Sequence, residues 1–156
     1  MSAQALVAAL TARGETLATA ESLTGGLLSG RICGVPGASG CFQGGVAAYQ
    51  DEVKEALLGV PPEIIQTHSA VSAPCASAMA RGARRLFHTA YALSTTGYAG
   101  PTGAEVGLVY IGLSSRRGEK TWELHLHGSR QGIREMTVCI AMYLLQKEIN
   151  DHGKEG

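Results

Sequence analysis

Residues 16–33, TLATAESLTGGLLSGRIC, decide the fold that this sequence predicts. The apolar segment 16–20 indicates a short buried strand, and residues 27–33 carry leucine and isoleucine at helical spacing. Between them, residues 21–26 combine an acid, a serine and two glycines, which is typical of a tight turn. The segment therefore predicts a strand, a turn and a helix in immediate succession.

The rest of the chain repeats this alternation of strands and helices. Further strands are predicted at 45–49, 89–97, 106–114 and 121–127. Two more helices are predicted over 51–59 and from Ser72 to Leu86. The pattern also predicts a first helix that ends at Gly14, a short helix that starts at Pro61 and a last helix that starts at Ser129. Strands separated by helices and followed by a hairpin predict an α/β fold with a mostly parallel sheet, one antiparallel strand and helices on both faces. The loops 21–26, 49–54 and 97–103 should then gather at the carboxyl ends of the strands, where such sheets bind ligands.

Length and charge limit the classes of function. The chain has 156 residues, with 13 Lys and Arg against 13 Asp and Glu and no linker or repeat, which predicts one domain over residues 1–156. A neutral chain has no overall field that attracts nucleic acid or an anionic membrane, so any bound anion must be held locally. The start of the chain lacks basic residues and no long apolar run follows, so we expect a cytoplasmic protein with no membrane partner.

The cysteine and histidine positions give no indication of a metal site. The four cysteines form no C-x-x-C pair and lie among small or apolar residues, which predicts reduced thiols in the core: Cys33, Cys41, Cys75 and Cys139. His125 and His127 alternate on one predicted strand, yet Glu123 is their only neighbour of a ligand type at suitable spacing. We therefore expect no bound metal.

Ser22 has two interpretations from its local sequence. A serine before a helix commonly caps it by accepting a backbone amide. However, Gly25 and Gly26 each cost about 1 kcal/mol of helix propensity, which favours a site where another group approaches the backbone closely. Amides exposed at a helix start can also bind an oxyanion. The alternative interpretation is therefore that Ser22 is a nucleophile, which would require a neighbouring base.

Two side chains are candidates for that base. His68 lies in a predicted loop, while Lys54 lies on the first turn of a predicted helix, five residues after Tyr49. Taken locally, each is equally compatible with a solvated surface side chain. The spacing of Tyr49 and Lys54 differs from the Y-x-x-x-K of short-chain dehydrogenases, and no G-x-G-x-x-G follows a strand, which argues against a nicotinamide oxidoreductase.

Several blocks in fixed order resemble the CinA C-terminal domain family, which includes nicotinamide mononucleotide deamidases. The blocks are TAESLTGG (19–26), VPGASG (35–40), FQGGVAAYQDEVKEALLGV (42–60), HSAVS (68–72), GYAGPTG (97–103) and VGLVYIGL (106–113). The resemblance implies a three-layer α/β/α sandwich that forms a homodimer or a higher homo-oligomer. It also implies hydrolysis of the carboxamide of nicotinamide mononucleotide to nicotinic acid mononucleotide and ammonia, so the expected partner is a pyridine mononucleotide, without metal or cofactor.

The same resemblance implies roles for individual residues. Ser22 would attack the amide carbon, and Lys54 would take its proton either directly or through Tyr49. A nicotinoyl-enzyme would then be hydrolysed by water. The expected oxyanion donors are the backbone amides of Thr24, Gly25 and Gly26.

The phosphate of such a substrate needs its own partners. Arg130 and Arg134 lie four residues apart at the start of the last predicted helix, where the helix dipole disfavours cations and a bound anion would relieve the conflict. Two solvated arginines are the alternative interpretation. The resemblance further implies that the glycine loop lines the pocket, with Thr96, Gly97, Ala99, Gly100 and Thr102 as binding residues.

Three positions depart from the family pattern. Leu23 replaces a cysteine, Tyr98 replaces an aliphatic residue, Thr102 replaces an aspartate, and the loop after Pro101 is shortened. These changes leave Ser22 and its partners intact but alter the substrate loop. They support an alternative function, that of a divergent paralogue that binds a nucleotide-like ligand with little or no deamidase activity.

Overall fold

The strands of the described chain form one mixed sheet in the order β2-β1-β3-β4-β5. The structure, a computed structural model, describes residues 2–152. The strands are β1 (Leu17–Glu21), β2 (Phe42–Ala47), β3 (Tyr91–Gly97), β4 (Leu108–Ser115) and β5 (Gly118–His125); the helices are α1 (Ala3–Arg13), α2 (Leu27–Cys33), α3 (Asp51–Leu58), α4 (Pro62–His68), α5 (Ala73–Phe87) and α6 (Arg130–His152), with a 3₁₀ turn at Ala38–Gly40. None of the helices in this range has the length and apolar composition needed to span a bilayer.

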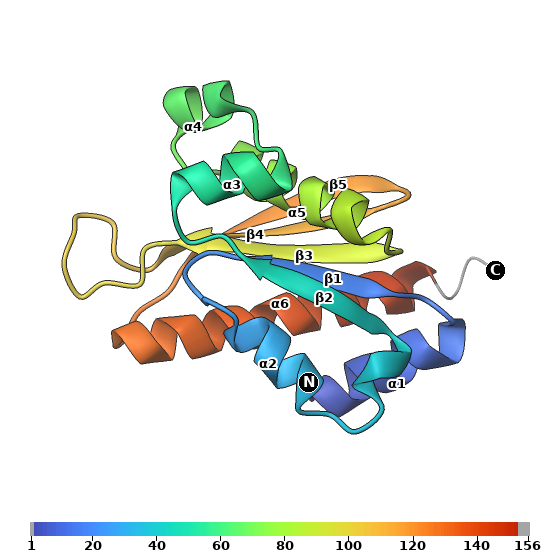
Figure 1. Cartoon of the computed structure of the whole chain (residues 1–156). Helices are drawn as coiled ribbons and strands as arrows, with labels where there is room; N and C mark the ends of the chain where they lie inside the picture. The colour runs from blue at the N-terminus through green and yellow to red at the C-terminus, as the bar shows by residue number, and fades with distance from the viewer. Residues whose placement is uncertain (1, 153–156) are drawn as a thin grey trace.

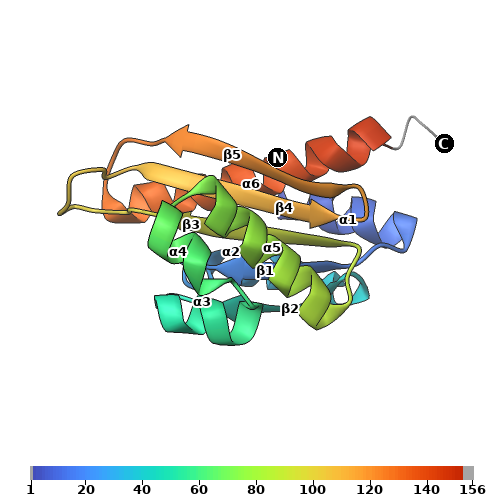
Figure 2. The same cartoon turned by 90° about the horizontal axis from the view of Figure 1, so that it is seen from above.

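The strand directions confirm the predicted fold. β1 pairs in parallel with β2 and β3, whereas β4 pairs antiparallel with β3 and β5, so β4 alone runs against the other strands of the described sheet. Helices α1, α2 and α6 cover one face and α3, α4 and α5 the other, which gives the three layers of an α/β/α sandwich (Figures 1 and 2). The prediction of a mostly parallel sheet needs a small correction. Because β4 pairs antiparallel with both β3 and β5, two of the four strand pairs within residues 2–152 are antiparallel.

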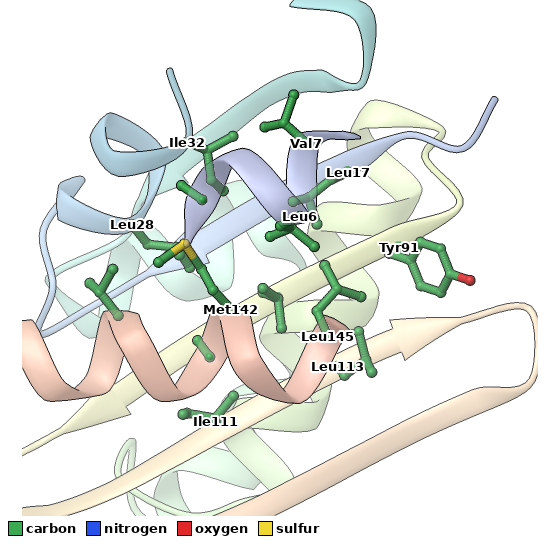
Figure 3. Packing of buried hydrophobic residues seen from close by; sticks show 14 of the residues in the cluster. Leu6, Val7, Leu17, Leu28, Ile32, Tyr91, Ile111, Leu113, Met142 and Leu145 are labelled. Carbon is green, nitrogen blue, oxygen red and sulfur yellow. The ribbon is translucent and has the colours of Figure 1, made fainter. Parts of the chain in front are cut away.

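A large apolar cluster attaches α1, α2 and α6 to the sheet. Figure 3 shows its members interdigitating, among them Leu6 of α1, Leu28 of α2, Ile111 of β4, and Met142 and Leu145 of α6. Side chains of this size contribute about 1.5–3 kcal/mol each when fully buried. The cluster therefore supplies the main free energy that holds the helices of this face in place.

A smaller cluster attaches α5 to the opposite face. Ala18 and Ala20 of β1 and Ala92 of β3 pack there against Met79 and Ala83 of α5. The small side chains on the sheet let the helix approach closely. Since both faces of β1 are covered, all five of its residues are buried, which explains its continuous apolar sequence.

β2 starts three residues before the predicted strand and ends two residues before it. The sequence predicted a strand at 45–49, whereas the strand is Phe42–Ala47. Gly45 pairs with Thr19, and a Cβ on Gly45 would lie only 2.1 Å from the Thr19 hydroxyl oxygen, so the close packing requires glycine. Tyr49 consequently follows the strand rather than closing it.

The prediction of four core thiols is wrong for two of them. Cys41 and Cys75 are buried, whereas Cys33 and Cys139 are exposed; all four are free. Cys33 is the last residue of α2, and Cys139 lies on the solvent side of α6, so neither reaches the sheet. Burial raises the pKa of the Cys41 thiol and raises that of Cys75 to about 11.

Candidate active site

A cavity of about 620 Å³ lies at the carboxyl ends of β1 and β3. The connections after β1, β2 and β3 all leave the sheet at this end (Figure 1), and each of the loops 21–26, 49–54 and 97–103 contributes to the cavity wall. The wall includes most of the predicted site residues: Ser22, Tyr49, Lys54, Thr96, Gly97, Gly100 and Arg130. The predicted residues that lie outside the wall are Thr24, Gly25, Gly26 and Arg134.

Ser22 follows β1 directly and is held by its backbone. Its amide donates to the Thr95 carbonyl of β3 at 2.9 Å, and its carbonyl accepts from the Gly25 amide at 3.0 Å. The residue is 8% exposed, and its hydroxyl makes no hydrogen bond with the described residues. α2 starts later, with Gly26 as its N-cap, so the interpretation of Ser22 as a helix cap is wrong.

The backbone conformation of the turn explains why it contains two glycines. Gly25 has φ of 56° and Gly26 has φ of 107°, a left-handed region that other residues rarely adopt. The Gly25 amide is already engaged with the Ser22 carbonyl. This hydrogen bond removes Gly25 as an available oxyanion donor, and the glycine pair is required for the path of the backbone.

Glu21 fixes the turn from beneath. It is 1% exposed, and one carboxylate oxygen accepts from the Thr24 hydroxyl at 2.6 Å and the Leu28 amide at 2.8 Å. The other oxygen accepts from the amide and the hydroxyl of Ser29 at 3.0 and 2.7 Å. The carboxylate thus satisfies the first amides of α2, which has no capping side chain of its own.

Thr24 and Arg134 complete this support. The Thr24 hydroxyl also lies 2.8 Å from the Thr95 hydroxyl. Arg134 donates from Nε to the Leu23 carbonyl at 2.9 Å and from Nη2 to the Thr24 carbonyl at 3.1 Å, while Nη1 donates to Gln131 at 2.7 Å. All three guanidinium nitrogens of Arg134 are therefore engaged within the protein, and the residue positions the serine turn.

Lys54 is buried beside the cavity. It is 2% exposed, although it belongs to α3, whose neighbouring Asp51 is 53% exposed. Its Nζ donates to the Tyr49 carbonyl at 3.0 Å and lies 3.7 Å from an Asp51 oxygen. The interpretation of Lys54 as a solvated surface residue is therefore wrong. His68, the other candidate base, is an exposed residue at the end of α4 and does not line the cavity.

Cys75 of α5 is a buried thiol close to Lys54. Burial is the main cause that raises the pKa of the Cys75 thiol to about 11, and the positive charge of Lys54 opposes that rise. Cys75 therefore stays protonated at neutral pH. Lys54 therefore lies close to a fully buried, uncharged thiol of α5.

Arg130 bridges two parts of the cavity rim. Its Nη1 donates to the Gly100 carbonyl at 2.6 Å, and its Nη2 donates to the Tyr49 hydroxyl at 3.2 Å. Tyr49 is 56% exposed, so its ring flanks the cavity from the solvent side. The Tyr49 hydroxyl is thus oriented by Arg130, and within residues 2–152 it makes no hydrogen bond to Lys54.

The glycine loop is shaped by close packing. The Thr96 hydroxyl donates to the Ala70 carbonyl at 2.7 Å and ties β3 to the loop before α5. A Cβ on Gly97 would lie 2.8 Å from the Leu108 carbonyl oxygen, and Gly100 has φ of 76°. Both glycines are therefore required for the course of the chain at the cavity wall.

The described residues hold no group of three or more His, Cys, Asp or Glu side chains suited to a metal ion. His125 lies 3.3 Å from a Glu123 oxygen on the exposed side of β5, where the two side chains are 69% and 52% exposed.

Comparison with known proteins identifies the family of this chain. The profile of the CinA C-terminal domain matches residues 1–149. The chain belongs to the CinA C-terminal domain family. A CinA-like protein of Anaeromyxobacter sp. is 46% identical over 90% of this chain and 35% of its own length. The chain spans about a third of the length of such relatives.

Solved structures of the CinA superfamily share the fold. A CinA superfamily protein from Klebsiella pneumoniae has a TM-score of 0.93 and 32% identity, with 96% of both chains covered. A competence/damage inducible protein from Agrobacterium tumefaciens has a TM-score of 0.91 and 34% identity, covering 95% of this chain and 93% of the other. This CinA domain is thus similar in fold over nearly its whole length to proteins of the competence-damage inducible type.

Two features of the CinA domain were missed by the sequence analysis. Glu21 supports the serine turn, and the signal for it was an acid placed between a buried strand and a helix that lacks a capping side chain. The backbone amide of Leu23 makes no hydrogen bond with the described residues, and Leu23 lines the cavity next to Ser22. Which amides are already occupied depends on the turn geometry, which the residue types alone did not reveal.

Proposed function

We propose that this CinA domain is an amidohydrolase that converts nicotinamide mononucleotide to nicotinic acid mononucleotide and ammonia. The observation that carries the proposal is the meeting of Ser22, buried Lys54 and Arg130 on one cavity of about 620 Å³. This volume lies within the ~300–1,000 Å³ of typical small-molecule sites, which is adequate for a mononucleotide. A hydroxyl without an internal partner, a buried amine and a rim cation are the groups that amide hydrolysis of a phosphate-bearing substrate requires.

In the first step the Ser22 hydroxyl oxygen attacks the carboxamide carbon, and its proton passes to the Lys54 amine. Lys54 can donate to the Tyr49 carbonyl and still hold one lone pair for that proton. The amide of Leu23, next to Ser22, is the best placed backbone donor for the oxyanion that forms. It replaces Gly25 in this role.

In the second step the carbon–nitrogen bond breaks, and Lys54 returns the proton to the leaving nitrogen, which departs as ammonia. Water then attacks the nicotinoyl ester on Ser22, with Lys54 again accepting a proton. The bond between the acyl carbon and the Ser22 oxygen breaks, Lys54 returns the proton to that oxygen, and nicotinic acid mononucleotide is released. Each proton taken by Lys54 is returned within the cycle, so no further reactant is needed.

Arg130 is the arginine that we assign to the substrate phosphate. It lines the cavity rim, whereas Arg134 lies outside the wall with its nitrogens engaged by the serine turn. Tyr98 is 39% exposed on the same wall and offers a ring face to the pyridine. Arg130 also donates to the Tyr49 hydroxyl at the same rim.

The test is ammonia release from nicotinamide mononucleotide by the purified chain, compared with its Ser22→Ala variant. We expect steady turnover by the wild type and none by the variant, while Ser39→Ala, an exposed serine outside the cavity, keeps the wild-type rate. Full turnover by Ser22→Ala would remove Ser22 as the nucleophile.

The same assay distinguishes the alternative function, a ligand-binding paralogue with little or no turnover. The altered residue Tyr98 on the cavity wall is the observation that favours it. Saturable binding of nicotinamide mononucleotide without ammonia release would support this alternative. Self-association as a homodimer or larger assembly remains a prediction, to be measured by light scattering.

A further inference from the structure

The wall of the cavity beside Ser22 carries one carboxylate. Among the described residues that line it, Lys54 and Arg130 are the cations and Asp51 is the acid. Glu21 lies beneath the serine turn rather than on the wall, and both of its oxygens already accept hydrogen bonds. Asp51 is therefore the source of negative charge on a wall whose cations otherwise attract anions.

Asp51 lies next to the proposed base. It is the first residue of α3, and its side chain is 53% exposed. One of its carboxylate oxygens lies 3.7 Å from the Nζ of Lys54, to which we assign the proton of Ser22. The Asp51 carboxylate makes no hydrogen bond with the described residues. It therefore acts on its surroundings through its charge.

The helix dipole accounts for an acid in the first turn of α3, but not for its place on the cavity wall. Asp51 and Glu52 both lie in that turn, where an acidic side chain stabilises the helix. Glu52 is exposed and lies outside the cavity. The two residues therefore share the contribution to the helix, and Asp51 alone of this pair adds its charge to the cavity.

The proposed reaction changes the charge of the ligand close to Asp51. Nicotinamide mononucleotide carries a neutral carboxamide, whereas nicotinic acid mononucleotide carries in its place a carboxylate that is ionised at neutral pH. Because Lys54 must come within hydrogen-bond reach of the reacting group, the new carboxylate also forms near Asp51. Two negative charges at such short range repel each other.

Without Asp51, the same wall would retain the product. A protonated Lys54 would pair with the new carboxylate, and the Leu23 amide would donate to it. Asp51 offsets the charge of a protonated Lys54 from 3.7 Å, so this attraction is reduced. The neutral carboxamide of the substrate gains or loses far less from either charge. The charge of Asp51 therefore acts against the product more than against the substrate.

We propose that Asp51 is a specificity-determining residue, which weakens the binding of a carboxylate in the cavity relative to that of the neutral carboxamide. The inference rests on the proposed function, because its two ligands are the substrate and the product of that reaction. It explains why the product is released rather than retained, and it gives a role to a side chain that the steps of hydrolysis do not use.

The experiment measures the dissociation constants of nicotinamide mononucleotide and nicotinic acid mononucleotide by isothermal titration calorimetry at neutral pH. Both ligands are titrated into the Ser22→Ala chain, which does not consume the amide. Adding Asp51→Asn to this chain should tighten the binding of the acid about 3- to 10-fold and change that of the amide by less than about 2-fold. An unchanged ratio of the two dissociation constants, or an equal change in both, would overturn the proposal.

Two matched variants in the same Ser22→Ala chain separate the cavity charge from the stability of α3. Glu52→Gln removes an equal charge from the same turn and should leave the ratio of the two dissociation constants unchanged. Asp51→Glu keeps the charge and should keep the ratio. A shift of the ratio in Glu52→Gln as large as that in Asp51→Asn would overturn the proposal.

Ammonia release by the wild-type chain tests the deamidase function separately. Binding of both ligands with the expected shift, but without ammonia release, would overturn the catalytic function alone and leave the role of Asp51 in place. Ammonia release with an unchanged ratio would overturn the role of Asp51 alone. Absence of binding for both mononucleotides would overturn the role of Asp51 as well, since the cavity would then not be their site.

Discussion

The two ends of the sheet carry charge in different ways. At the carboxyl end, Lys54 is 2% exposed and donates to a backbone carbonyl, and Arg130 is held by Gly100 and Tyr49. At the other end, Arg116 and Arg117 are exposed in a hairpin turn. A buried lysine on the wall of a cavity is suited to proton transfer, whereas exposed arginines are largely screened by water.

The direction of the chain explains the difference. Strands β1 and β2 run into the starts of α2 and α3 at the carboxyl end, so backbone amides with few internal partners gather there. Helices α1 and α5 finish at the opposite end, where the dipole favours basic side chains. The same α/β connectivity therefore supplies amide donors at one end and arginines at the other.

The largest expected effect concerns Lys54, the proposed base. Replacing Lys54 by Met keeps the volume but removes the proposed proton acceptor, so kcat for deamidation should fall on the order of 10²- to 10⁴-fold. Initial rates of ammonia release measure the change. Lys147→Met, an exposed lysine of α6, is the control and should keep the wild-type rate. A kcat of the Lys54→Met variant within about 3-fold of the wild-type value would contradict the assignment of Lys54 as the base.

The second effect concerns the support of the serine turn. In the wild type, the Leu28 amide and the amide and hydroxyl of Ser29 all donate to the Glu21 carboxylate. Glu21→Gln replaces one accepting oxygen by an NH₂ group that cannot accept these hydrogen bonds, so the free energy of unfolding should fall by about 2–4 kcal/mol. Denaturant unfolding followed by circular dichroism provides the measurement. Glu52→Gln, exposed on α3, should change stability by less than about 0.5 kcal/mol, and an equal loss in both variants would contradict the role of Glu21.

A smaller effect separates binding from chemistry at the carboxyl end. Tyr98→Val removes the ring on the cavity wall, so KM for nicotinamide mononucleotide should rise about 3- to 10-fold with kcat nearly unchanged. Steady-state kinetics measure both constants. Tyr143→Val removes a tyrosine that is 50% exposed on α6, outside the cavity, and should alter neither. A fall in kcat alone would contradict a role in substrate binding.

The smallest expected effect is a pH-dependent loss of stability on replacing Glu148 of α6. Burial alone would raise the pKa of Glu148, but hydrogen bonds from Lys120 and His152 outweigh it and lower the pKa below the ordinary 4.5. The resulting stabilisation is present above pH 4.5 and is lost as the pH falls through the lower folded value. Glu148→Gln should therefore be less stable than wild type by about 0.5–1 kcal/mol at pH 7. Thermal unfolding should show this gap closing in acid, and a constant gap would contradict the assignment.

The sequence predicted the carboxyl end far better than the opposite end. Ser22 and its turn lie in one contiguous block, and Tyr49 and Lys54 lie in another, so patterns of neighbouring residues and the family resemblance could identify them. A smaller cavity of about 150 Å³ at the opposite end is assembled from single residues at positions 13, 84, 91 and 115–117, which only the fold brings together. Contacts of that kind carry no local signal.

The same reasoning explains the errors within the serine site. Arg130 and Arg134 share a helix face and could not be told apart by spacing, yet one meets the cavity rim and the other the serine turn. The Gly25 amide was predicted to be free, but the turn closes a hydrogen bond to the Ser22 carbonyl. Spacing identifies which residues are near a site, while the backbone path decides which atoms remain available.

The support of the serine turn has a consequence for how this site can change in evolution. Glu21, Thr24 and Arg134 hold the turn by contacts with backbone groups and with α2, and none of them lines the cavity. The side chain at position 22 can therefore be exchanged while the backbone that presents it stays in place. New reactivity at this position is open to evolution by single substitutions, without prior rebuilding of the scaffold.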